Sequence, residues 1–189
     1  MEGLSPIFIM AEEHRLIRRG LELLDTAAVK VTRSKLPEGF WPDMVGFFKN
    51  FAGKCHHAKE ESHLIPEIIR YNKPDAKEWC GLIIEEHEKG RELISEIEVY
   101  SRMLGNDPEA PLKLIKALRT YIKLLQAHIA KEDHMFPRLA MPFPRGLMER
   151  LFRSFEEEDR ASIGSGGIEK YKDLIERLEK QLDQDPQHL

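Results

Sequence analysis

Residues 57–66 read HAKEESHLIP and residues 128–137 read HIAKEDHMFP. In both stretches His, Glu, His and Pro fall at relative positions 0, 4, 6 and 9, as His57, Glu61, His63 and Pro66 and again as His128, Glu132, His134 and Pro137. A second motif, Glu-Glu-His followed by Arg four residues after the His, occurs at 12–18 and again at 85–91. The chain therefore contains an internal repeat, in which the pair of segments at 12–18 and 57–66 recurs at 85–91 and 128–137.

The segments around these motifs have the apolar spacing of helices. Apolar residues recur every three to four positions, and alternating runs typical of strands are nearly absent. We expect long helices at about 6–33, 42–71, 83–104 and 109–139, with Ser5 and Pro6 starting the first. Short connections favour antiparallel neighbours, so the fold class is all-α, an up-down-up-down four-helix bundle. Pro66 and Pro137 should bend or end their helices.

Two further helices are expected at about 146–160 and 168–182. We therefore divide the chain into a bundle domain, residues 1–140, and a C-terminal helical extension, residues 141–189. The last helix carries an apolar stripe that suits packing on the bundle or on a partner, including a second copy of the chain. The stripe consists of Tyr171, Leu174, Ile175, Leu178 and Leu182.

Composition narrows the classes of function. The chain has 189 residues and a formal net charge of −4, so nothing favours nucleic-acid binding. Cys55 and Cys80 lie far apart without CxxC spacing, which predicts buried free thiols and a reducing compartment. The sequence shows neither a signal peptide nor a membrane-spanning run, so we expect a cytoplasmic protein without a membrane partner.

Six polar residues occupy the helical faces that should form the apolar core: His14, His57, Glu61, His87, His128 and Glu132. A buried carboxylate without a partner costs several kcal/mol, so these residues need a compensating charge. The HxxxE spacing places the two side chains next to each other on a helix, where both can bind one ion. Imidazoles with carboxylates suit iron, with manganese or zinc less favoured, whereas calcium and magnesium prefer more oxygen ligands.

The remaining histidines are expected outside this site. His63 and His134 lie two residues beyond their glutamates and so point away from it, and His56 is one position off the face of His57. Glu13 and Glu86 precede His14 and His87; they could accept imidazole N–H bonds, or simply belong to a solvated face.

These motifs resemble the bacterial type of the haemerythrin-like (HHE cation-binding) family, four-helix bundles that enclose a non-haem di-iron centre. The family pattern is one His, then HxxxE, then one His, then HxxxE, and the six core residues match it in order. The flank at 55–61, CHHAKEE, and the tail around 155–171 are also similar to the family. The resemblance implies two iron ions as cofactors, held by these six residues with Glu61 and Glu132 as bridges.

The resemblance implies a function in binding or reacting with O₂, H₂O₂ or NO, in redox or stress chemistry. The oxygen-carrying members place HxxxH on the third helix, and here the residue four after His87 is Arg91. Because this histidine ligand is missing, the resemblance implies peroxidase, catalase or oxidase-like turnover more than reversible oxygen carriage. The alternative is a non-enzymatic sensor or store of oxygen, nitric oxide or iron, in which the last helix relays the state to a partner.

A ferritin-like bundle is excluded, because it needs Glu-x-x-His motifs on two helices. Glu60 and His63 fit that motif, but its counterpart on the other helix begins with Lys131.

Overall fold

The computed structural model describes residues 5–33, 36–72, 75–164 and 166–183, and all regular secondary structure within them is helical. The helices are α1 (Pro6–Lys30), α2 (Phe40–Gly46), η2 (Phe47–His56), α3 (His57–Lys59), η3 (Glu60–Leu64), α4 (Ile65–Tyr71), α5 (Asp75–Arg102), α6 (Ala110–Leu139), α7 (Arg145–Ser162) and α8 (Glu169–Asp183). The predicted all-α fold with additional C-terminal helices is confirmed. None of the described helices is long and apolar enough to cross a membrane.

The segment from α2 to α4 is one continuous helix, which we call the composite helix (residues 40–71). We expected an ordinary α-helix at 42–71, but two parts of it, η2 and η3, are π-helical. A π-turn closes with an i→i+5 hydrogen bond, so it holds one residue more than an α-turn. The two π-helical stretches flank His57, and the second contains Glu61, the other residue of this helix expected to bind metal.

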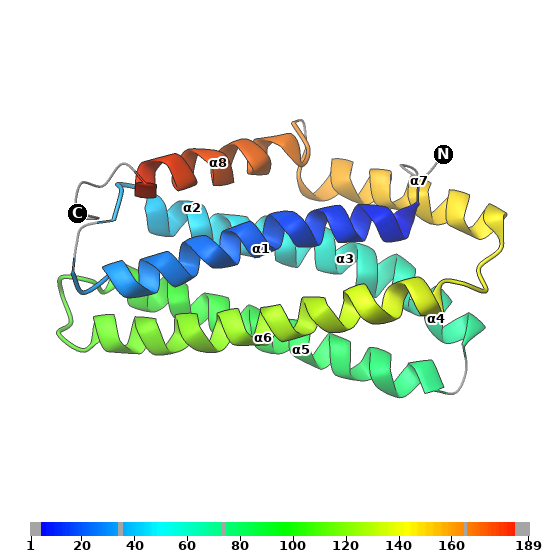
Figure 1. Ribbon diagram of the computed structural model, residues 1–189, viewed down its shortest axis with the longest axis horizontal. Coiled ribbons are helices and arrows are strands. Elements are labelled where there is room, and N and C mark those ends of the chain that lie inside the picture. The colour runs from blue at the N-terminus through cyan, green and yellow to red at the C-terminus, as the bar shows by residue number, and fades with distance from the viewer. Residues whose placement is uncertain (1–4, 34–35, 73–74, 165, 184–189) are drawn as a thin grey trace.

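Four helices form the bundle: α1, the composite helix, α5 and α6 (Figure 1). α7 and α8 lie end to end as a further layer along α1 and the composite helix (Figure 1). The last helix buries Tyr171, Ile175, Leu178 and Leu182 against the bundle. The ion pair between Arg19 and Glu179, at 2.6 Å, also joins α8 to α1.

The two prolines act at helix boundaries. α6 ends at Leu139, two residues after Pro137. Pro66 is the second residue of α4, directly after the second π-helical stretch. Proline lacks the N–H that an α-helix interior uses, so both positions interrupt regular α-helical hydrogen bonding.

The core is divided into two apolar clusters. One contains Leu21, Phe47 and Leu118, and the other contains Met10 and Phe136. On α1 and α5, His14 and His87 lie between residues of the first cluster and residues of the second, so a buried polar layer separates the two. This layer is the candidate site.

Candidate metal centre

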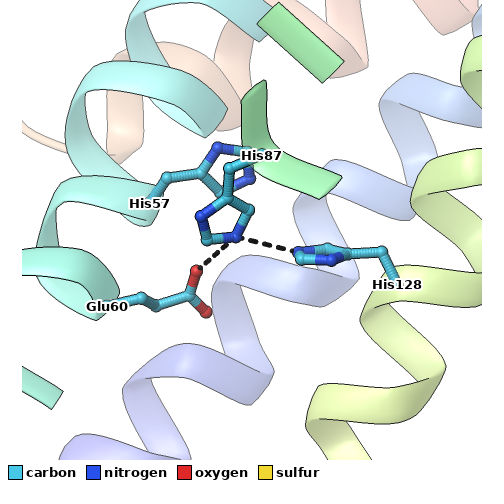
Figure 2. A group of neighbouring side chains, drawn as sticks. All are labelled: His57, Glu60, His87 and His128. Atoms are coloured by element: carbon cyan, nitrogen blue, oxygen red, sulfur yellow. Dashed lines mark hydrogen bonds and ion pairs between the residues drawn. The ribbon is translucent and has the colours of Figure 1, made fainter. Parts of the chain in front are cut away.

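Five imidazoles and two carboxylates make up the buried polar layer. Two groups of their donor atoms are close enough to hold a metal ion: His57, Glu60, His87 and His128, and His14, His56, Glu60 and Glu132. Figure 2 shows the first group, in which the rings of His57 and His87 lie one above the other and Glu60 and His128 point to His87. Because Glu60 belongs to both groups, the two candidate positions are adjacent.

Four imidazoles point Nε2 into the centre. Nε2 of His87 lies 3.2 Å from Oε2 of Glu60 and 3.1 Å from Nε2 of His128. Nε2 of His14 and Nε2 of His128 lie 3.3 Å and 3.1 Å from Oε2 of Glu132. Nε2 of His56 lies 3.3 Å from Oε1 of Glu60.

The opposite nitrogen of each of these four rings faces a carboxylate. The Nδ1 to oxygen distances are 2.6 Å for His14 and Asp133, 2.8 Å for His56 and Glu13, 2.7 Å for His87 and Glu61, and 3.0 Å for His128 and Glu86. An ionised carboxylate can only accept, so Nδ1–H donates, and in the neutral ring the Nε2 lone pair faces inward. This is the tautomer that a metal ion needs.

Each of the four carboxylates also contacts a basic side chain. Lys59 and Lys131 contact Glu13 and Glu86, and Arg18 and Arg91 contact Asp133 and Glu61, as ion pairs. The two halves of the bundle are therefore matched: Glu13, His56 and Lys59 correspond to Glu86, His128 and Lys131. In the same way His14, Asp133 and Arg18 correspond to His87, Glu61 and Arg91.

Several donor atoms of the centre are buried and lack a hydrogen-bond partner among the described residues. They include both carboxylate oxygens of Glu60 and of Glu132, Nε2 of His14 and Nδ1 of His57. Each such atom, buried and unsatisfied, costs about 1–3 kcal/mol, and more when it is charged. Divalent ions at the two positions would satisfy these donors together, so the residues present fit a two-metal centre.

The charges of the centre are balanced by protons when no metal is bound. Burial would lower the pKa of His14, but the hydrogen bond to Asp133 and the nearby carboxylate of Glu132 raise it to about 9. Burial would also lower the pKa of His87. The carboxylates of Glu132, Glu60 and Glu61 outweigh this effect and raise the pKa to about 11. Burial and the charge of Glu132 raise the pKa of Glu60. Metal binding would therefore displace protons from this layer.

The structure brings together five of the six predicted residues: His14, His57, His87, His128 and Glu132. It does not bring Glu61 into either group. The carboxylate of Glu61 is 30% exposed and bonds to Nδ1 of His87 and to Arg91, while the adjacent Glu60 is fully buried in the centre. His56, which we expected outside the site, also lies in it.

The difference comes from one extra residue in the second π-helical stretch. Counted from Pro66 and Pro137, the two halves are offset by 71 residues, and this offset pairs Glu61 with Glu132. Up to the first residue of η3 the structural offset is 72, which pairs His56 with His128 and Glu60 with Glu132. A π-turn accommodates the additional residue without breaking the helix. The tetrapeptides AKEE at 58–61 and AKED at 130–133 carry this offset in the sequence.

His57 breaks the match between the two halves. Its ring stacks on that of His87, with centroids 3.8 Å apart and an angle of 11°. At the offset of 72 its counterpart is Ile129, a buried apolar residue. The first group thus has three imidazoles and the second has two. Arg91, four residues after His87, belongs to neither group.

The other expectations concern residues outside the centre. His134 is exposed, and His63 lies at the surface, 3.5 Å from Glu158 of α7. Cys55 and Cys80 are buried free thiols. Glu13 and Glu86 do accept imidazole N–H bonds, each from a ring on a neighbouring helix.

The family comparison agrees with this geometry. The family model described as the hemerythrin HHE cation binding domain matches residues 5–140. Neither the curated proteins nor the solved structures gave a match. The matched range spans the four bundle helices and both groups of donors, so the chain belongs to the hemerythrin HHE cation-binding family.

Proposed function

We propose that the protein is a non-haem di-iron protein whose buried centre binds or reacts with a small molecule such as O₂, H₂O₂ or NO. The observation that supports it most is the pair of donor groups that share Glu60. A carboxylate with both oxygens free of hydrogen bonds among the described residues can bridge two ions, and Glu132 offers a second such carboxylate.

The donor set favours iron. Imidazoles combined with carboxylates suit iron, with zinc or manganese as weaker candidates, and the mixture has too few oxygens for calcium or magnesium. Three imidazoles with Glu60 serve one position, and two imidazoles with Glu60 and Glu132 serve the other. The second position has fewer nitrogen ligands and is the better candidate for binding an external small molecule.

A pocket of about 180 Å³ reaches this second position. Its lining includes His14 and Glu132 at the centre, the apolar side chains of Met10 and Phe136, and the charged side chains of Arg15, Arg18 and Asp133. A pocket of this size gives a small molecule a route to the centre. Bound iron would supply the one-electron redox chemistry that O₂, H₂O₂ and NO require.

The chain's own residues hold the centre in place for this chemistry. Asp133 orients the ring of His14 beside the pocket, and Arg18 neutralises that carboxylate. On the other side of the centre Glu61 and Arg91 do the same for His87. Such outer carboxylates fix the tautomer and raise the basicity of a metal-binding imidazole.

A sensor is the second candidate, and one contact favours it. Nζ of the buried Lys59 lies 2.6 Å from Oδ1 of Asp159 on α7, and the same ammonium contacts Glu13, the partner of His56. A change in the position of His56 would therefore be transmitted to α7. The extension helices α7 and α8 would then transmit this change in position to a protein partner.

The experiment that separates the two candidates measures turnover. Iron-loaded, reduced protein is mixed with H₂O₂, O₂ or NO, and the optical spectrum and the amount of reagent consumed are followed. An enzyme consumes many equivalents of one reagent per centre, whereas a sensor reacts about once and changes the protease sensitivity of the residue 141–183 region. A centre whose spectrum responds to none of the three would contradict the proposal.

A further inference from the structure

A second pocket, of about 370 Å³, lies between η2 and α5 and meets the centre at His57. We call it the His57 pocket. Its lining residues are Phe48, Lys49, Gly53, Lys54, His57, Gly90, Arg91, Ile94, Ser95 and Tyr121. Its volume falls within the range of small-molecule sites in proteins.

The His57 pocket exists because one half of the internal repeat lacks core side chains that the other half has. Gly90 of α5 corresponds to Ile17 of α1 at the offset of 73 that relates His14 to His87. Gly53 and His57 correspond to Leu125 and Ile129 at the offset of 72. Ile17, Leu125 and Ile129 are all buried in the apolar core. Close packing is therefore replaced by a cavity on one side of the bundle only.

Packing does not require glycine at position 90. A Cβ added to Gly90 would meet only Leu125 and Tyr121, both at 3.8 Å, which is ordinary van der Waals contact. The backbone conformation does not require glycine either, because its φ is not positive. The absence of a side chain at this position leaves space, and a larger residue would take that space up.

Two polar side chains that line the pocket have no hydrogen bond to another described residue. His57 is 5% exposed, and unlike the other four imidazoles of the centre it bonds to no carboxylate through either ring nitrogen. Tyr121 is 3% exposed, and no hydrogen bond of its hydroxyl is found within the described part of the chain. Both side chains can offer a polar group to a molecule bound in the pocket.

The charged residues that line the pocket are all cations: Lys49, Lys54 and Arg91. Lys54 is exposed, Lys49 pairs with Glu98, and Arg91 pairs with Glu61 and Glu88, none of which lines the pocket. The walls between these cations and His57 are apolar, formed by Phe48, Ile94 and the ring of Tyr121. A hydrated inorganic anion would not match such walls, and a neutral hydrocarbon would not use the cations.

We propose that the His57 pocket binds a small organic anion with a flat apolar body, such as an aromatic carboxylate. The carboxylate faces Lys54 and Arg91, and the body lies between Phe48, Ile94 and Tyr121 with its inner end at His57. The binding of this anion does not depend on the proposed function. Its consequence does rest on the proposed function: the anion would come within reach of the metal position that includes His57, and not of the other position.

Benzoate is the probe, titrated into the full chain as purified, with calorimetry and with metal content measured on the same sample. We expect one benzoate per chain with a dissociation constant below about 1 mM, and affinity for benzyl alcohol weaker by about tenfold or more. No binding of benzoate would overturn the proposal whatever the metal content. Equal binding of benzyl alcohol would overturn the anionic part.

Gly90→Ile supplies the side chain that the other half of the bundle carries, and Gly81→Ile is its control on the same helix, where nothing lies within 4 Å. We expect Gly90→Ile to abolish benzoate binding with metal content unchanged, and Gly81→Ile to keep both. Benzoate affinity equal in the two variants would place the site elsewhere.

A charge variant tests the same pocket without filling it. Lys54→Glu changes an exposed residue and should weaken benzoate binding by about tenfold. Lys123→Glu, on the exposed face of α6, is the matched control and should leave it unchanged. Equal effects of the two would show general electrostatics and would overturn the assignment to this pocket.

Discussion

Nδ1 of His14 lies 2.6 Å from Oδ1 of Asp133, and this contact joins the first bundle helix to the last. Three equivalent contacts join α1 to the composite helix, the composite helix to α5, and α5 to α6. The four imidazole–carboxylate hydrogen bonds therefore form a closed ring around the bundle. The carboxylate that holds each imidazole lies on a different helix from that imidazole. Metal affinity and helix packing therefore depend on the same contacts.

Removing one carboxylate from this ring should weaken metal binding without abolishing it. For Asp133→Ala we expect a loss of about 10–100-fold in iron affinity, because His14 keeps its place but loses the acceptor that fixes its tautomer. Competition with a chelator of known affinity measures it. Glu61→Ala should give a loss of similar size, since Glu61 holds His87 in the same way. Unchanged affinity in both variants would contradict the ring.

The two adjacent glutamates of the composite helix should differ sharply. Glu60→Ala removes the carboxylate shared by both donor groups and should leave about one metal ion or fewer per chain. Glu61→Ala should retain about two when iron is in excess, because Glu61 lies outside both groups. Elemental analysis of the two variants side by side checks this prediction. Retention of both ions in Glu60→Ala with loss in Glu61→Ala would restore the assignment made from the sequence repeat.

The sequence predicted the fold because apolar residues recur at helical spacing along four long segments. It indicated a polar centre because buried polar residues at that spacing have few explanations. The structure brings five of the residues expected there into the two donor groups: His14, His57, His87, His128 and Glu132. The sequence pattern favoured Glu61 over Glu60 because hydrophobic periodicity assumes α-helical turns throughout, and nothing in that period reports a π-turn. The tetrapeptides AKEE at 58–61 and AKED at 130–133 align at the offset of 72 found in the structure. The downstream His and Pro residues align at an offset of 71 instead. The carboxylate ring joins different helices, so no spacing within one helix could reveal it.

Metal removal should make stability depend on pH. In the metal-free protein the folded pKa of His14 is about 9, above the ordinary value of 6.5. Its contribution to stability is therefore complete below about pH 6.5 and is lost as the pH rises towards 9. We expect the urea midpoint of chelator-treated protein to fall between pH 7 and pH 9. Iron-loaded protein should show a higher midpoint and a smaller fall, because an imidazole bound to metal through Nε2 has no Nε2 proton to lose. The same fall in both samples would contradict this account.

The ion pair between Lys59 and Asp159 should hold α7 against the bundle. Asp159→Asn leaves the fully buried ammonium of Lys59 with Glu13 as its remaining carboxylate, and we expect a loss of about 1–3 kcal/mol in the free energy of unfolding. Glu157→Gln, at an exposed position on the same helix, is the control and should change stability by less than about 0.5 kcal/mol. Urea denaturation measures both, and equal values would show that the ion pair contributes nothing.

Both cysteines should be unreactive in the folded protein. Burial raises the pKa of the Cys80 thiol to about 11 and raises that of Cys55 further. At pH 8 about one Cys80 in a thousand is therefore thiolate, the form that reacts. A chromogenic disulfide reagent should label neither thiol on the timescale on which it labels both in urea. Rapid labelling of the native protein would show that these residues are accessible.

The central claim is that two metal ions share one buried centre, and the most direct test is the number of metal ions per chain in freshly purified protein. The account predicts about two irons per chain from elemental analysis, consistent with two donor groups that meet at Glu60. One ion per chain, or none after reconstitution with excess iron, would contradict it.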